Sequence, residues 1–305
     1  MATPTADPSA ALPRFSSVVY GTWRLLDDAA AAAPEPLAAR LSACADLGIT
    51  TVDTAEVYGR YEVEEHLGAA LRRAPGLRAK LQIVTKCGIY VPVPRHPDRK
   101  VAYYDASAAR IVASAEKSLR LLGTDRLDLL LLHRPDWLTP ADETAAGLER
   151  LLRDGKILSA GVSNYTVDQL QTLQSRMGVP LATNQIELSL FRMDPITDGT
   201  LQQCERLRMR PMAWSPLGGG RLFREEDVVS ARIRAACAEL APRYAGAPPE
   251  ALALAWILAL PARPMVVVGT NRTERLRAAA AAASIRLERP DWYRLWEAAQ
   301  GRRIP

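Results

Sequence analysis

The sequence contains four side chains that could together hold and move a proton. Asp53 and His133 each directly follow a short apolar segment, Lys86 stands two residues after the end of another, and Tyr58 stands five residues after Asp53. Neighbouring strands of a sheet lie about 4.8 Å apart, so Asp53 and Lys86 can touch if their segments pair. A lysine buried at such a place needs an anionic partner, because an isolated ammonium is costly in a protein interior. The spacing therefore predicts an Asp53–Lys86 ion pair, which in its simplest interpretation is structural.

A charged Lys86 would also act on Tyr58. A free tyrosine has a pKa near 10. A positive charge about 4 Å away, at an effective dielectric constant near 20, stabilises the phenolate by about 4 kcal/mol. This corresponds to roughly three pKa units, so we expect a phenol that exchanges its proton near neutral pH.

Eight short apolar or β-branched segments separate longer segments of helical character. They cover residues 18–20, 50–52, 82–84, 128–132, 158–162, 182–186, 211–214 and 265–268. Each has the length and composition of a buried parallel strand, in which the alternation of polar and apolar residues is lost. Amphipathic helices are predicted over residues 37–47, 105–122, 139–153, 166–176 and 228–240. Thr139 and Thr166 are expected to cap two of them, and Gly48 and Gly123 to end two others.

Strand–helix alternation repeated eight times predicts an α/β fold with a parallel sheet closed into a (β/α)8 TIM barrel. An open doubly wound sheet that binds a dinucleotide normally carries a G-x-G-x-x-G turn after its first strand. Here Gly21, Thr22 and Trp23 follow that strand and do not fit the pattern. We therefore expect residues 15–305 to form one barrel domain, preceded by a disordered tail over residues 1–14.

Composition and charge exclude several classes of protein. The chain has 305 residues, 48% of them hydrophobic, which is ordinary for a globular protein and excludes collagen and general disorder. The net charge of +5 is spread over the sequence without a basic run longer than a pair, so nucleic acid is not an expected partner. The longest apolar stretch, residues 251–260, is too short to span a bilayer, so no membrane association is expected.

Four isolated cysteines and three histidines complete the inventory of reactive side chains. The cysteines form no CxxC pair, which indicates reduced thiols in a cytoplasmic protein. One histidine at a strand end does not make a metal site, since a zinc centre needs three or four ligands. We expect no metal, and a monomer or a small homo-oligomer.

Polar residues cluster at the ends of seven of the predicted strands. They are Asp53 with Thr54, Thr85 with Lys86, His133, Ser163 with Asn164, Asn184 with Gln185 and Glu187, Trp214 with Ser215, and Gly269 with Thr270. In a parallel barrel all these ends converge on one rim, which is where such enzymes hold their reactive groups. A single polar strand end is usually a cap or a turn, whereas seven in register predict a functional rim.

Several segments resemble the aldo-keto reductase family. Residues 48–59 read GITTVDTAEVYG, and Lys156 is followed by GVSNY over residues 161–165. Residues 184–187 (NQIE) and 213–217 (AWSPL) are similar to two further segments of the family, and residues 212–223 to a bacterial branch of predicted oxidoreductases. The segments fall in family order, and the resemblance extends from about Tyr20 to the C-terminus.

The resemblance implies NADPH-dependent reduction of an aldehyde or ketone. Tyr58 would protonate the carbonyl oxygen, Lys86 held by Asp53 would lower the pKa of Tyr58, and His133 would orient the carbonyl. Ser163, Asn164 and Gln185 would bind the nicotinamide carboxamide, Trp214 would stack on its ring, and Ser215, Leu217 and Gly219 would lie against the pyrophosphate. Further cofactor contacts are expected from Thr22, Pro216, Gly269, Thr270, Arg272 and Arg275.

The last segment departs from the family pattern. Many members have Pro-Lys-Ser where this chain has Val268, Gly269 and Thr270, so the usual lysine is absent. Arg275 remains at the position that resembles the adenosine 2′-phosphate arginine. We therefore expect NADPH to be preferred and NADH to be possible.

Aromatic residues next to strand ends are candidates for the wall of a substrate pocket. Trp23, Tyr90 and Trp137 each follow a strand end closely, so we expect them to contact a small-molecule carbonyl substrate. Two other functions are open to the same sequence. One is a barrel enzyme in which Lys86 forms a Schiff base, and the other is a cofactor-binding regulatory subunit of the same fold.

Overall fold

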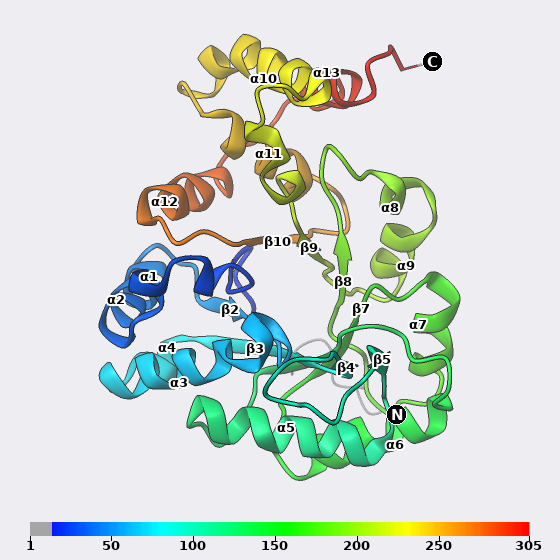
Figure 1. Ribbon diagram of the computed structural model, residues 1–305. Helices are drawn as coiled ribbons and strands as arrows, with labels where there is room; N and C mark the ends of the chain where they lie inside the picture. The colour runs from blue at the N-terminus through cyan, green and yellow to red at the C-terminus, as the bar shows by residue number, and fades with distance from the viewer. Residues whose placement is uncertain (1–13, 305) are drawn as a thin grey trace, which may run out of the picture.

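The eight predicted strands form a closed parallel barrel. The computed structural model of the protein describes residues 14–304, and the tail expected over residues 1–14 lies outside them except for Arg14. The order around the barrel is β1-β10-β9-β8-β7-β6-β3-β2 (Figure 1). The strands are β1 Val18–Gly21, β2 Thr51–Asp53, β3 Gln82–Cys87, β6 Leu129–Leu132, β7 Ala160–Ser163, β8 Asn184–Glu187, β9 Met212–Trp214 and β10 Met265–Val268. The TIM-barrel prediction is confirmed, and the open doubly wound sheet is excluded by closure.

Helices surround the barrel and lie between successive strands (Figure 1). The longer ones are α2 Pro34–Asp46, α3 Val63–Arg73, α5 Ala108–Leu122, α6 Ala141–Arg153, α7 Val167–Gln174, α9 Thr200–Arg206, α11 Pro249–Leu258 and α12 Thr273–Ala282. Short helices are α1 Ala29–Ala32, α4 Leu77–Lys80, α8 Asp194–Thr197, and the 3-10 turns η2 Leu25–Asp27, η3 Tyr58–Tyr61, η4 Gly218–Phe223 and η5 Ala241–Tyr244. Two more helices, α10 Val228–Leu240 and α13 Arg289–Gln300, pack together at one edge of the molecule.

The ends of the helices confirm three of the four expected caps. Thr166 caps α7 in a reciprocal arrangement with Gln169, while Gly48 and Gly123 adopt left-handed backbone with φ of 75° and 65°. The expectation for Thr139 is wrong. Pro140 occupies the N-cap position of α6, and the Thr139 hydroxyl donates instead to Asp136.

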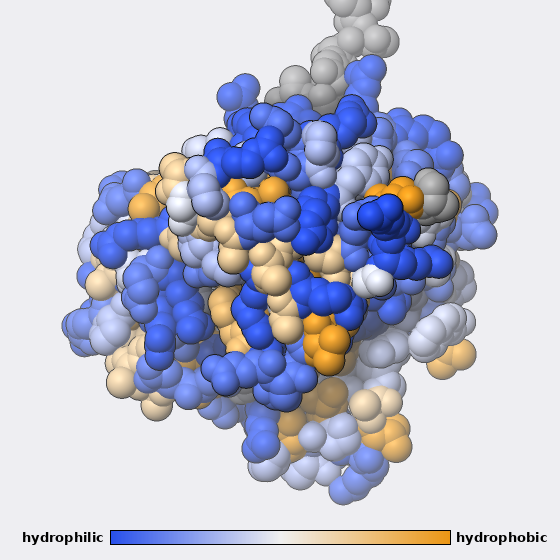
Figure 2. All heavy atoms as spheres, turned by 90° about the horizontal axis from the view of Figure 1, so that it is seen from above, coloured by the Kyte–Doolittle hydropathy of each residue, from blue (hydrophilic) through white to orange (hydrophobic). Residues whose placement is uncertain are grey.

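Two layers of apolar side chains hold the barrel. The interior is filled by a cluster made of Val19, Val84, Leu129, Leu131, Ala182, Met212, Met265 and Val267. A larger cluster lies between the outer face of the strands and the helices. Hydrophilic residues dominate the face seen in Figure 2, and hydrophobic residues gather there only in small groups. All four cysteines are buried free thiols. Within residues 14–304, no helix is long and apolar enough to cross a bilayer.

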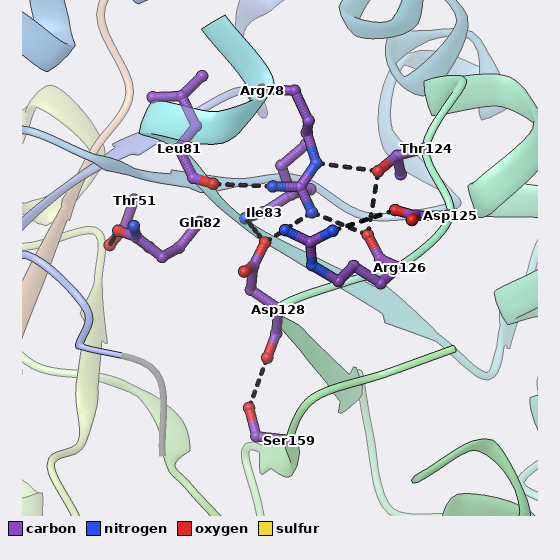
Figure 3. A network of polar contacts seen from close by, with 10 residues as sticks. All are labelled: Thr51, Arg78, Leu81, Gln82, Ile83, Thr124, Asp125, Arg126, Asp128 and Ser159. Atoms are coloured by element: carbon purple, nitrogen blue, oxygen red, sulfur yellow. Dashed lines mark hydrogen bonds and ion pairs between the residues drawn. The ribbon is translucent and has the colours of Figure 1, made fainter. Parts of the chain in front are cut away.

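A polar network joins the amino-terminal ends of β3 and β6, away from the polar strand ends (Figure 3). The Asp128 carboxylate accepts from the Ile83 backbone N–H at 2.8 Å and from the Arg78 guanidinium at 2.9 Å. Arg78 also donates to the backbone carbonyls of Leu81 and Arg126. These bonds satisfy backbone groups that would otherwise be unpaired and hold the two strands in register.

A buried carboxyl, Glu64 of α3, packs against the outer face of the barrel. Thr85 donates its hydroxyl to one oxygen at 2.6 Å, and Ser118 donates to the other at 3.0 Å. Burial raises the pKa of Glu64 to about 7, and the nearby Glu56 carboxyl adds to the increase. Because the folded-state pKa exceeds the ordinary value of 4.5, the stability contributed by Glu64 is complete below pH 4.5 and is lost as the pH rises through about 7.

Glu64→Gln should therefore change how stability depends on pH. Between pH 5 and pH 8.5 we expect the wild type to lose about 1–3 kcal/mol of unfolding free energy relative to the variant, because the amide cannot ionise. Urea unfolding at the two pH values measures this difference. Glu143→Gln, which removes an exposed carboxylate of α6, is the control and should follow the wild type. A pH dependence in Glu64→Gln equal to that of the wild type would contradict the expectation.

Candidate active site

The carboxyl ends of the strands surround a cavity of about 850 Å³. Residues in or after every one of the eight strands line it, which is the arrangement that barrel enzymes use to assemble reactive groups. One lining residue from each strand end, in chain order, is Gly21, Tyr58, Ile89, His133, Ser163, Gln185, Trp214 and Gly269. The functional rim predicted from the strand ends is therefore one continuous cavity.

Lys86 lies directly beneath this cavity and joins Tyr58 to Asp53. Its ammonium donates to the Asp53 carboxylate at 2.8 Å, to the Thr54 carbonyl at 2.8 Å and to the Tyr58 hydroxyl at 3.0 Å. All three N–H donors are thus used, although Lys86 is only 1% exposed. β2 and β3 are neighbours in the barrel, so the ion pair expected from strand spacing forms as anticipated.

The same contacts keep Lys86 charged. Burial works to lower the pKa of Lys86, but Asp53 and Tyr58 outweigh it, and the net direction is upward. The ammonium thus persists at neutral pH. A nucleophilic lysine needs the opposite, a depressed pKa that frees its lone pair.

The expected decrease in the Tyr58 pKa does not occur. Burial raises the pKa of Tyr58, Lys86 opposes the increase, and burial prevails. The Coulomb argument treated Lys86 alone, whereas the hydroxyl is also desolvated and faces the Asp53 carboxylate. Tyr58 therefore carries its proton at neutral pH, which suits a group that donates one.

His133 stands beside Tyr58 as a neutral imidazole. The two rings meet edge to face with centroids 5.8 Å apart, and the Trp23 ring also meets that of Tyr58 edge to face, with centroids 4.9 Å apart. Burial, Lys86 and Arg134 hold the pKa of His133 well below 6.5. Its buried Nδ1 atom has no hydrogen-bond partner within the described part of the chain. A neutral ring at this place can share a hydrogen bond with a ligand oxygen without contributing charge.

Amide and hydroxyl groups from β7 and β8 extend the polar floor of the cavity. Asn164 donates to the Ser163 hydroxyl at 2.8 Å and accepts from the Trp214 indole N–H at 2.9 Å. Gln185 donates to Asp53 at 2.7 Å, so it links this group to the ion pair across the barrel. The four residues expected around a nicotinamide are therefore adjacent, and the Trp214 indole is anchored at its nitrogen.

The loop after β9 provides backbone suited to an anion. Ser215 and Gly219 adopt positive φ values of 49° and 63°, and the nearest atom to a β-carbon built on Gly219 is 3.9 Å away. Both residues line the cavity together with Pro216 and Leu217. The exposed Arg275 also lines the cavity. A cavity lined by amide side chains, a glycine-containing loop and an arginine fits a dinucleotide phosphate cofactor.

The sequence model described as the Aldo/keto reductase family matches residues 17–300. This chain belongs to the aldo/keto reductase family. This chain is 45% identical over 290 residues to a 6-dehydroglucose reductase from Agrobacterium fabrum. The match covers 95% of this chain and 96% of the relative. This chain is 42% identical over 293 residues to the oxidoreductase YdhF from Escherichia coli, covering 96% of each.

Solved structures agree with this family membership. An aldo/keto reductase from Klebsiella pneumoniae in complex with NADP and acetate is 31% identical, with a TM-score of 0.75, and covers 93% of this chain and 90% of its own. The glycerol dehydrogenase from Gluconobacter oxydans is 26% identical, with a TM-score of 0.79, covering 93% of this chain and 91% of its own. Both chains match almost the full length of this aldo/keto reductase.

Besides Lys86, which lies beneath the cavity, four residues expected in the site of this aldo/keto reductase lie outside the lining of the cavity. Thr22 is fully buried, and its hydroxyl donates to the backbone carbonyl of Asp53 at 3.0 Å, so it stabilises the end of β2. Arg272 is exposed at the start of α12. Tyr90 is 3% exposed, because its ring stacks on Tyr103. Trp137 is exposed and packs against Tyr104.

Two neighbours of Tyr90 line the cavity where Tyr90 was expected. Ile89 and Val91 line the cavity on either side of Tyr90, in and after the short strand β4 Ile89–Tyr90, which pairs with β5 Tyr103–Tyr104. Sequence reasoning also missed several other lining residues: Arg24, Asp27, Val57, Arg60, Arg134, Phe223, Glu250, Leu254 and Ala279. Arg60 and Arg134 carried a sequence signal, since they follow Tyr58 and His133 closely. Among residues 14–304, no cluster of three potential metal ligands occurs.

Proposed function

We propose that this oxidoreductase reduces aldehydes and ketones to alcohols with NADPH, and that Tyr58 is the general acid. The observation that carries the proposal is the 3.0 Å bond from the Lys86 ammonium to the Tyr58 hydroxyl at the floor of the cavity. A bound nicotinamide would supply hydride to the carbonyl carbon. As charge develops on the carbonyl oxygen, the Tyr58 hydroxyl gives it a proton, and the resulting phenolate is stabilised by Lys86.

Asp53 and His133 assist Tyr58 and Lys86 by holding a charge and by positioning the substrate carbonyl. Asp53 keeps Lys86 protonated, and the neutral His133 directs the carbonyl oxygen toward the Tyr58 hydroxyl by sharing a hydrogen bond. At neutral pH Tyr58 carries the proton that this role requires, and Lys86 opposes the increase in its pKa that burial causes. These assignments are supported by the contacts and burial of the four residues.

The cofactor assignment is supported by the cavity and by the NADP complex of the Klebsiella reductase. Ser163, Asn164 and Gln185 would hold the carboxamide, and Trp214 would stack on the nicotinamide ring. The backbone from Ser215 to Gly219, with Gly269 and Thr270 opposite, would hold the phosphates. NADPH is preferred in this proposal because the Arg275 guanidinium can form a bidentate, charge-assisted pair with the 2′-phosphate of NADPH. NADH remains usable.

Arg275→Ala should narrow the preference for NADPH. We expect the KM for NADPH to rise about tenfold or more, because a charge-assisted hydrogen bond to the 2′-phosphate is lost, while the KM for NADH changes little. Steady-state kinetics with both cofactors measures the ratio of the KM for NADH to the KM for NADPH. Arg272→Ala removes an equal charge outside the cavity and is the matched control. If Arg272→Ala changes the ratio and Arg275→Ala does not, the phosphate contact has been assigned to the wrong arginine.

The proposal is tested by mixing purified protein with NADPH and a panel of aromatic and sugar aldehydes. The sugar aldehydes are included because of the name of the Agrobacterium relative. Loss of the reduced cofactor's absorbance with formation of the alcohol is the expected result. Tight cofactor binding without turnover of any aldehyde would refute reduction and favour the regulatory subunit.

The Schiff-base alternative is less consistent with the site. Its nucleophile would have to be Lys86, whose pKa is raised by Asp53 and Tyr58. Borohydride trapping of a carbonyl compound on Lys86 would support that alternative. A cytoplasmic location belongs to the same proposal as the reductase, and four buried free thiols support it.

A further inference from the structure

Two arginines line the end of the cavity next to Tyr58 and His133. Arg134 directly follows His133 after β6, and Arg60 stands two residues after Tyr58. Neither guanidinium has an ion pair or hydrogen bond with any residue between 14 and 304. Arginine is the side chain best suited to bidentate recognition of a carboxylate, and a partly buried one without a partner is unusual.

Arg134 is half-buried, and its nearest carboxylate in the sequence is engaged elsewhere. One oxygen of Asp136 accepts from the Ala106 N–H at 3.0 Å and from the Thr139 hydroxyl. The other oxygen accepts from the Leu138 N–H at 3.0 Å. Asp136 thus organises the loop after β6, and Arg134 forms no ion pair with a carboxylate of residues 14–304.

Arg60 is placed by an uncommon turn directly after Tyr58. Gly59, Arg60 and Tyr61 all have left-handed backbone, with φ of 54°, 57° and 74°. For residues other than glycine this conformation is strained by about 1 kcal/mol or more, and such strain is concentrated at functional sites. The turn places the exposed Arg60 at the rim of the cavity rather than continuing a helix.

The carboxylates that line the cavity do not neutralise this end. Asp53 is paired with Lys86 and bonded to Gln185. Glu250 belongs to the first turn of α11, in the segment between β9 and β10 that also holds the glycine loop. Asp27 lies in the turn that begins after Arg24, whose guanidinium reaches the carbonyl of Gly219. The tyrosine end is therefore positive, and the effect of Arg134 on the pKa of both Tyr58 and His133 agrees with that location.

We infer that Arg134, with Arg60 at the rim, forms a carboxylate subsite, and that the preferred substrates are aldehydes or ketones bearing a carboxylate. This inference rests on the proposed reductase function and narrows its substrate class. The body of the substrate lies against the apolar wall made by Trp23, Ile89 and Val91. The carboxylate forms a bidentate pair with Arg134 while the carbonyl oxygen meets Tyr58.

A pair of aldehydes that differ only in charge tests the inference. The wild type should show a kcat/KM for para-formylbenzoic acid about tenfold or more above that for its methyl ester, because a charge-assisted bond to Arg134 is gained. The preference should decrease with added salt as the exposed Arg60 is screened. A kcat/KM for the ester equal to or above that for the acid would overturn the inference, while the proposed reductase function would still stand.

Three variants locate the subsite. Arg134→Gln should bring the ratio of kcat/KM for the acid to that for the ester close to one, and Arg134→Lys should keep part of this ratio, because the charge stays and the bidentate geometry is lost. Arg126→Gln is the control, since Arg126 is paired with Asp125 outside the cavity and its loss changes net charge equally. A preference unchanged in Arg134→Gln, or reduced equally in Arg126→Gln, would contradict the assignment.

Binding separates this inference from the proposed function. If no aldehyde is reduced, the reductase function fails, and calorimetric titration with para-hydroxymethylbenzoic acid in the presence of NADP+ still decides the subsite. Binding to the wild type that weakens about tenfold in Arg134→Gln would support the inference. Equal binding to both proteins, or no binding to the wild type, would refute it.

Discussion

Tyr58→Phe should reduce kcat for carbonyl reduction by about a hundred- to ten-thousand-fold, the range by which general acids accelerate reactions. The variant keeps the ring that packs against Trp23 and His133 and loses only the hydroxyl. Since the hydroxyl is the proton donor closest to the Lys86 charge, no other group can replace it at the same place. Cofactor affinity should change little, because the proposed cofactor contacts lie at the ends of β7 to β10 and in the segments that follow these strands.

Kinetics with NADPH and an aldehyde, together with calorimetric titration of the cofactor, measure the two effects separately. Tyr90→Phe is a matched control, because it removes a buried hydroxyl that bonds to Ser114 outside the cavity lining. It should leave kcat near that of the wild type. If Tyr58→Phe retained most of its kcat, the general acid would lie elsewhere. If it lost cofactor binding as well, Tyr58 would be a structural residue.

Lys86→Met should abolish reduction and destabilise the fold by about 3–5 kcal/mol, the cost of breaking a buried ion pair from one side. Methionine has a stem of similar length, so packing is largely kept. Asp53, which is 2% exposed, would be left as a buried charge whose main partner is gone. Urea unfolding followed by tryptophan fluorescence measures the loss of stability.

Removing both charges separates stability from activity. In the double variant Lys86→Met with Asp53→Asn, no unpaired charge remains and Gln185 can still donate to the amide oxygen at position 53. We expect most of the lost stability to return, while reduction stays lost because nothing cationic faces Tyr58. If Lys86→Met and the wild type had the same free energy of unfolding, an unpaired Asp53 would not destabilise the fold, contrary to the prediction. Recovery of reduction in the double variant would argue against the role of Lys86.

The residues beside the catalytic segments illustrate how far sequence pattern reaches. Trp23 lines the cavity, whereas Tyr90 does not, and its neighbours Ile89 and Val91 line it instead. Within a short strand, successive side chains point to opposite faces, so an error of one residue reverses the outcome. Chain position alone does not say which face of β4 meets the cavity, because the pairing with β5 decides it.

The sequence by itself determined the closed barrel and the meeting of Asp53, Lys86 and His133, with Tyr58 on the loop after Asp53, at one rim. These depend on local periodicity and on the rule that parallel strand ends converge, both of which can be read along the chain. Only the tertiary structure decided the direction of the Tyr58 pKa, the bond from Gln185 to Asp53 and the absence of an ion pair between Arg134 and a carboxylate of residues 14–304. Desolvation and pairing depend on every atom packed around a group, and those atoms come from segments far apart in the sequence.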